Sequence, residues 1–163
     1  MSASEVQVWV TIIGGLVTAS VAILTFFNYR TRRDRAAAVG SAFSSTVDGL
    51  AGERATSQIA AAVLLRRFFD ARTEQGRGGR PYREETVNLI AGALRDESAG
   101  TLQKALADGL RYARDLKSAD LQQCNLSKAY LGVKAGDTWQ LDLSHADLFE
   151  ATLDEASLKE VIA

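Results

Sequence analysis

The chain of 163 residues has only one cysteine, one histidine and one proline, and aromatic residues make up only 7% of it. A single cysteine excludes an intramolecular disulfide framework and any cysteine-rich metal site. One histidine beside one cysteine removes most routes to a catalytic triad or a zinc centre. The net charge of −1 excludes a strongly basic nucleic-acid binder. We therefore expect a non-enzymatic protein with no cofactor and no bound metal.

Charge divides the chain into three zones. Residues 1–29 carry one charge, residues 30–113 carry 14 basic and 10 acidic side chains, and residues 114–163 carry 5 basic and 9 acidic ones. We expect a tail over 1–7, a transmembrane helix over 8–28, a helical region over 29–114 and a repeat region over 115–163.

The first zone has the composition of a membrane span. Residues 8–27 hold no charged side chain, and about 20 apolar helical residues match a hydrocarbon core of about 30 Å. The segment before them has no basic residue, unlike a cleaved signal peptide. Four basic residues come directly after the span: Arg30, Arg32, Arg33 and Arg35. The positive-inside rule then predicts a single-pass protein of the inner (plasma) membrane, with an outer N-terminus, a cytoplasmic bulk and the lipid bilayer as a partner.

Small residues recur along this predicted span at spacings that let two helix backbones approach closely. They are Gly14, Gly15, Thr18, Ala19 and Ala22. We expect self-association through this face, so that the protein is a homo-oligomer. The alternative is that glycine and alanine are simply common in membrane helices.

The second zone is predicted to be a small all-helical subdomain of three to five helices. Apolar residues recur at helical spacing over 43–69, 87–94 and 102–113, and Gly49 and Gly52 indicate a break between two helices. The glycine-rich stretch 74–82 lacks the lysine and hydroxyl residue that close a P-loop. We interpret it as a helix–helix connection.

The third zone is an internal repeat of five residues. Ala119-Asp120-Leu121 is the first of seven units in one phase, and residues 132–140 interrupt them. A period of five fits neither a helix nor a strand and indicates a solenoid. A small residue, a polar residue and leucine in this order resemble the signature of pentapeptide repeat proteins. A span, an alanine-rich helical segment and such repeats together resemble bacterial membrane-anchored members of that family.

The resemblance implies a right-handed quadrilateral β-helix in which each unit forms one side. Cys124 takes the place of an interior alanine, so it is expected to be a buried small hydrophobe. His145 falls at an outward position, and Trp139 in the interruption either fills a gap, which we favour, or offers an exposed contact. The expected repeat core is Leu121, Cys124, Leu126, Leu131, Leu143, Leu148, Leu153 and Leu158.

Seven units make fewer than two coils, and the last residues are apolar and in phase with the repeat. Either the natural chain continues beyond Ala163, or the open end docks onto another subunit. The family brings no catalytic residues. We therefore expect a membrane-tethered scaffold that binds an unknown protein partner. One alternative is an oligomeric membrane effector of a defence or toxicity system. A second is an acidic DNA mimic, although nucleic acid is an unlikely direct partner at this charge.

Overall fold

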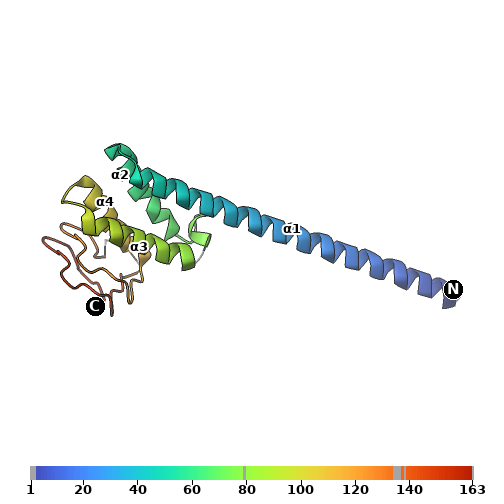
Figure 1. Ribbon diagram of the computed structural model, residues 1–163. Helices are drawn as coiled ribbons and strands as arrows, with labels where there is room; N and C mark the ends of the chain where they lie inside the picture. Colours follow the sequence, from blue (N-terminus) through green and yellow to red (C-terminus); the bar gives the residue numbers. More distant parts are fainter. Residues whose placement is uncertain (1–2, 79, 134–136, 138, 163) are drawn as a thin grey trace. The chain divides into compact units, whose positions relative to one another are not determined.

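The computed structural model (Figure 1) describes residues 3–78, 80–133, 137 and 139–162, without the side chains of 3–24, 26, 27, 78, 80 and 81. The chain divides into two compact units, Met1–Ala38 and Val39–Ala163. Helix α1 (Ala3–Ala51) forms the first unit, and its last turns belong to the second.

Helix α1 corrects the predicted membrane topology. The helix does not stop at residue 28 but continues through the four arginines to Ala51. None of the helices, over the residues that the structure describes, is long and apolar enough to cross a membrane. The transmembrane helix over 8–28 and the single-pass inner-membrane localisation were therefore wrong predictions. Most side chains of that segment, including Gly14, Gly15, Thr18, Ala19 and Ala22, lie outside the described residues.

The four arginines expected beside a membrane lie on exposed helical turns of α1. Arg30 Nε lies 4.0 Å from a carboxylate oxygen of Asp34, one helical turn further along. Both side chains are more than two-thirds exposed, so this pair contributes little to stability.

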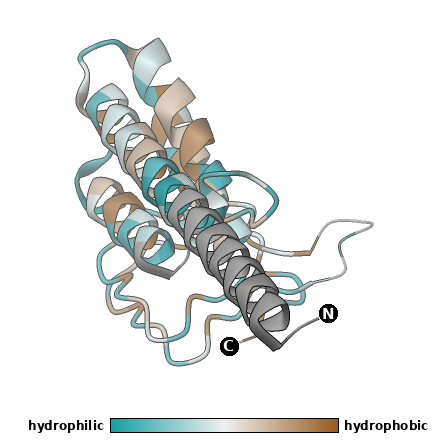
Figure 2. Ribbon diagram, turned by 90° about the vertical axis from the view of Figure 1, so that its right-hand side faces the viewer, coloured by the Kyte–Doolittle hydropathy of each residue, from teal (hydrophilic) through white to brown (hydrophobic). Residues whose placement is uncertain are grey.

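Short helices build the first part of the second unit. They are α2 (Ala55–Leu65), the 3-10 helix η1 (Arg66–Phe68), η2 (Gly76–Gly78), α3 (Arg80–Asp96), α4 (Thr101–Leu110) and η3 (Arg111–Ala113). The chain breaks between α1 and α2 around Gly52, where the sequence predicts a break. Figure 2 shows apolar residues interspersed with polar ones along these helices, as expected for helices with one buried face.

The helices pack around one apolar core. Leucines and an isoleucine from three helices are completely buried, and burying each stabilises the fold by about 1.5–3 kcal/mol. An aromatic cluster extends the core, since the rings of Phe43 and Phe68 meet edge to face with centroids 5.2 Å apart. The fully buried helical residues are Leu65, Ile90, Leu94, Leu106 and Leu110.

The C-terminal part of the second unit consists of two stretches of chain, 115–133 and 141–162. We call them the inner and the outer segment. They run parallel and are joined by isolated bridges, such as Asp120 with Asp147 and Asn125 with Thr152. The predicted quadrilateral β-helix is wrong, because the fold is mainly helical and the described residues contain no sheet and no β-helix.

The physical reason lies in the turns. In each unit of five residues, only one residue forms a bridge, and a turn begins two residues after it. No two consecutive residues therefore pair, so a regular strand cannot form.

Candidate interaction surface

The five-residue units of the two segments, except the one that begins at Tyr130, have the same local conformation. A bridging residue is followed by leucine, by two turn residues and by a small residue. Within the turn, the small residue donates its backbone N–H to the leucine carbonyl, as Ala119 does to Leu116 at 3.0 Å. The second turn residue has a positive φ, for example 59° at Ser118 and 57° at Gln123. Such a conformation costs about 1–2 kcal/mol in a residue other than glycine, so the turn bonds must offset it.

Aspartate or asparagine at the bridging position stabilises this turn. Its side-chain oxygen accepts the backbone N–H two residues later, as in Asp120 to Gln122 at 3.1 Å and Asp147 to Phe149 at 3.0 Å. This arrangement is an Asx turn, which explains why the repeat prefers aspartate and asparagine there.

The leucines of the repeat fill the space enclosed by the two segments, and their burial falls along the chain. The leucines of the inner segment are buried, whereas those of the outer segment become more exposed toward its end. Leu148 and Leu153 are only partly buried, and Leu158 is 41% exposed. The buried members of the predicted core are Leu121, Cys124, Leu126, Leu131 and Leu143.

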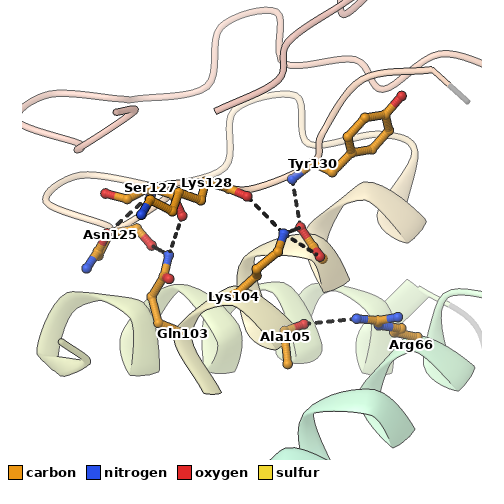
Figure 3. A network of polar contacts seen from close by, with 9 residues as sticks. Arg66, Gln103, Lys104, Ala105, Asn125, Ser127, Lys128 and Tyr130 are labelled. Carbon is orange, nitrogen blue, oxygen red and sulfur yellow. Dashed lines mark hydrogen bonds and ion pairs between the residues drawn. The ribbon is translucent and has the colours of Figure 1, made fainter. Parts of the chain in front are cut away.

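Helix α4 holds the inner segment from one side (Figure 3). Gln103, which is almost fully buried, donates its side-chain amide to the carbonyls of Asn125 at 2.7 Å and Ser127 at 3.1 Å. Lys104 Nζ donates to the carbonyl of Lys128 at 2.9 Å. These bonds satisfy backbone oxygens that a single stretch of chain cannot pair by itself.

A second anchor comes from Arg111, a buried arginine. Its Nε donates to the carbonyl of Gly132 at 2.9 Å, and its guanidinium pairs with Asp137. The guanidinium carbon lies 5.0 Å from the ring centre of Trp139 and 5.6 Å from that of Tyr130. Trp139 is partly buried, so it packs against cations at the edge of the interruption.

Charged side chains connect the two segments at their surface. Lys117 Nζ lies 3.1 Å from a carboxylate oxygen of Asp142. Hydrogen bonds from Ser144, and then Lys117, hold the pKa of Asp142 below its usual value. The hydrogen bond to Asp142 and its charge raise the pKa of Lys117. A hydrogen bond from the side chain of Gln122 lowers the pKa of Asp147 in the same way.

The titratable groups that most often serve catalysis are poorly placed for it here. Burial raises the pKa of the Cys124 thiol, whose Sγ lies 3.4 Å from the carbonyl oxygen of Ala91. His145 is exposed on a turn with a φ of 63°. Over the described part of the chain, no group of three histidine, cysteine or acidic residues could hold a metal ion.

The outer segment has one free edge. At its start, the backbone N–H of Leu143 donates to Ile162 at 2.7 Å, and Ile162 donates to the carbonyl of Leu141 at 2.9 Å. The last described residue, Ile162, thus pairs with the start of this edge. In the next three units, the backbone groups that correspond to the N–H of Leu143 and the carbonyl of Leu141 have no backbone partner among the described residues. These are the N–H groups of Leu148, Leu153 and Leu158 and the carbonyls of Ala146, Ala151 and Ala156.

The side chains beside this edge are apolar or acidic. Phe149 is 64% exposed and Ile162 is 45% exposed. Residues 141–163 carry six carboxylates and one lysine, a net charge of −5, and Lys117 and Lys128 of the inner segment pair with two of these carboxylates. We call the free backbone groups and these side chains of the outer segment the outer edge.

Sequence reasoning missed the anchors made by Gln103, Lys104 and Arg111. By their spacing they fall on the polar face of the helical segment, where ordinary surface residues are expected, so nothing in the sequence indicated their carbonyl partners. The arginines of α1 and the small residues of the predicted span belong to the first compact unit, and the repeat core belongs to the second.

No protein-family model, no characterised protein and no solved structure matches this chain. The resemblance to pentapeptide repeat proteins stays a prediction, and the function has to be argued from the outer edge itself.

Proposed function

We propose that this protein is a non-enzymatic interaction module, and that its outer edge binds an extended, basic segment of a partner protein. The proposal rests on one observation, the row of N–H and C=O groups along the outer segment that have no backbone partner among the described residues. Such a row is a template on which another stretch of chain adds by backbone hydrogen bonds.

The spacing of the free groups supports an extended occupant. Ile162 already pairs with Leu141 and Leu143 through its own N–H and C=O groups. A segment that continues in this way meets one N–H and one C=O in every unit of five residues. The exposed ring of Phe149 and the half-exposed Leu158 then provide apolar contacts beside the backbone bonds.

The charge of the outer edge supports a basic occupant. Glu150, Glu155 and Glu160 occupy the tips of three successive turns. Two copies of the same edge would bring these carboxylates together, and like charges destabilise a close contact. A lysine- or arginine-rich segment would instead be attracted to them. The homo-oligomer that the sequence predicts is therefore a separate outcome of the test below.

The experiment uses the full chain, kept in mild detergent because residues 8–27 carry no charge. The first probe is a peptide with the sequence of 141–162 in which Glu150, Glu155 and Glu160 are replaced by lysine. The second probe is the unaltered peptide, and the third is the lysine peptide in scrambled order. Fluorescence anisotropy of each labelled peptide measures the dissociation constant.

We expect the lysine peptide to bind at least about tenfold more tightly than the other two, which is a difference of about 1.4 kcal/mol. The double variant Glu150→Lys and Glu155→Lys should remove this preference. The matched control is Glu74→Lys, an exposed charge reversal in a loop between η1 and η2, and it should leave this preference unchanged. Equal binding of the unaltered peptide would favour a second copy, and no binding of either would refute the outer edge as a docking site.

A further inference from the structure

A second feature of the molecule is lined by residues other than those of the outer edge. A cavity of about 600 Å³ opens between the first turns of α4, the helix η1 and the turn at 127–128 of the inner segment. This volume falls in the range of about 300–1,000 Å³ that is usual for small-molecule sites. Three cationic side chains line it, namely Arg66, Lys104 and Lys128 (Figure 3).

The charges around this cavity do not balance. Asp108 is the carboxylate among the lining residues, and it pairs with Lys104 at 3.1 Å. Lys104 also donates to the carbonyl of Lys128, so its position is fixed. Among the described residues, Arg66 has no carboxylate partner, and Lys128 Nζ lies 3.9 Å from Glu155 in an ion pair whose side chains are 68% and 76% exposed, so this pair contributes little. Three cations against one carboxylate leave the cavity with a net charge of +2.

The side chain of Arg66 has a fixed position, but one of its hydrogen-bond donors has no partner. Its Nη2 donates to the carbonyl of Ala105 at 3.2 Å, and its guanidinium carbon lies 5.2 Å from the ring centre of Tyr112. Its Nε is buried and has no hydrogen-bond partner among the described residues. A buried charged donor without a partner is costly, so a ligand that reorients this guanidinium would recover free energy.

The backbone at the cavity adds to the cationic side chains. Helix α4 starts at Thr101 after the N-cap Gly100, and no side chain caps its first turn. The first N–H groups of a helix have no partner inside the helix and carry a partial positive charge. Both residues line the same cavity as Arg66 and Lys128. A divalent cation would therefore be repelled, whereas an anion would be attracted from two sides.

We propose that this cavity binds the phosphate group of a small phosphorylated molecule. A phosphate dianion matches the net charge of +2, and its oxygens accept hydrogen bonds from a guanidinium and an ammonium group. The cavity is larger than an inorganic phosphate ion, so the remainder of the ligand would lie along its other lining residues, which are Ala99, Gln103, Ala105 and Ser127. No residue belongs to both the cavity and the outer edge, but Lys128 forms an ion pair with Glu155 of the outer edge at 3.9 Å. The Arg66 variant, which does not touch that pair, therefore distinguishes a failure of this proposal from a failure of the other.

The test measures binding to the full chain by isothermal titration calorimetry. The probes are inorganic phosphate and ribose 5-phosphate, with sodium chloride at matched ionic strength as the reference. We expect ribose 5-phosphate to bind more tightly than phosphate alone, and both to raise the melting temperature above that in chloride. Lys128→Gln, at a side chain that is 68% exposed and safe to replace, should weaken binding at least about tenfold. Arg66→Gln should do the same.

Arg67→Gln is the matched control, because Arg67 is an exposed neighbour on the same helix η1 and does not line the cavity. Its affinity should remain that of the unaltered protein. Phosphate that binds no better than chloride would overturn the proposal. An equal loss of affinity in Arg67→Gln and Lys128→Gln would also overturn it, because that result indicates diffuse attraction to a basic surface.

Discussion

Replacing Gly132 by alanine tests how closely the inner and outer segments approach each other. A Cβ atom at Gly132 would lie 2.8 Å from the carbonyl oxygen and 2.9 Å from the nitrogen of Lys159. Ordinary contacts of a Cβ begin at 3.4 Å, so the two backbones must separate by 3.4 − 2.8 = 0.6 Å or stay strained. Separation would break the bonds from Gly132 to Ser157 at 2.9 Å and from Val133 to Lys159 at 3.0 Å.

Both routes lead to a similar loss of stability. Two lost hydrogen bonds cost about 2 kcal/mol, and strain from overpacking costs about 1–3 kcal/mol. We therefore expect Gly132→Ala to lower the free energy of unfolding by about 2–3 kcal/mol. In urea, where the slope is about 1–3 kcal/mol per molar for small proteins, the midpoint should fall by about 1 M or more.

The matched control is Gly92→Ala in the middle of α3. A Cβ there meets no atom within 4 Å, and alanine favours a helix over glycine. This variant should gain about 0.5–1 kcal/mol. Urea unfolding followed by circular dichroism measures both variants. If Gly132→Ala unfolds at the same urea concentration as the unaltered chain, the close approach of the two segments is wrong.

Three further predictions concern buried or charged groups. Because burial raises the pKa of the Cys124 thiol, iodoacetamide should label the folded protein slowly and the urea-unfolded protein quickly; fast labelling of both would contradict its burial. Ser144 lowers the pKa of Asp142, so this carboxylate stabilises the fold above its unfolded pKa of about 3.9 and loses that effect as the pH falls. Asp142→Asn should melt earlier than the unaltered chain at pH 7 but not at pH 2, and parallel melting profiles would refute this. Arg111→Met removes the cation that pairs with the Asp137 carboxylate and should cost about 3–5 kcal/mol in urea unfolding, whereas a loss below about 1 kcal/mol would show that the buried pair is unimportant.

The five-residue repeat shows which features of the fold a local sequence pattern can predict. The spacing of small, polar and leucine residues correctly marks one unit per five residues, because each unit folds into the same turn. The pattern could not show that the second turn residue adopts a left-handed conformation. Residues such as Ser118, Gln123 and Glu150 do not favour it by themselves. The hydrogen bonds of the turn and those between the two segments, such as Gln123 to Phe149, offset its cost together, and the second kind is absent from any single unit.

The sequence by itself determined the helical nature of the middle of the chain, the break near Gly52 and the phase of the repeat. Each depends on neighbours within a few residues, through apolar spacing, glycine and Asx turns. The absence of proline from 29–51 also allowed α1 to continue through its exposed arginines, whereas only the tertiary structure decided that Leu121 is buried and Leu158 is 41% exposed. It also decided which side chains hold the inner segment, because Gln103 and Arg111 find their carbonyl partners 21 to 24 residues away. Long-range pairing of this kind leaves almost no trace in local composition, and for this reason the outer edge and the cationic cavity become visible only in the folded chain.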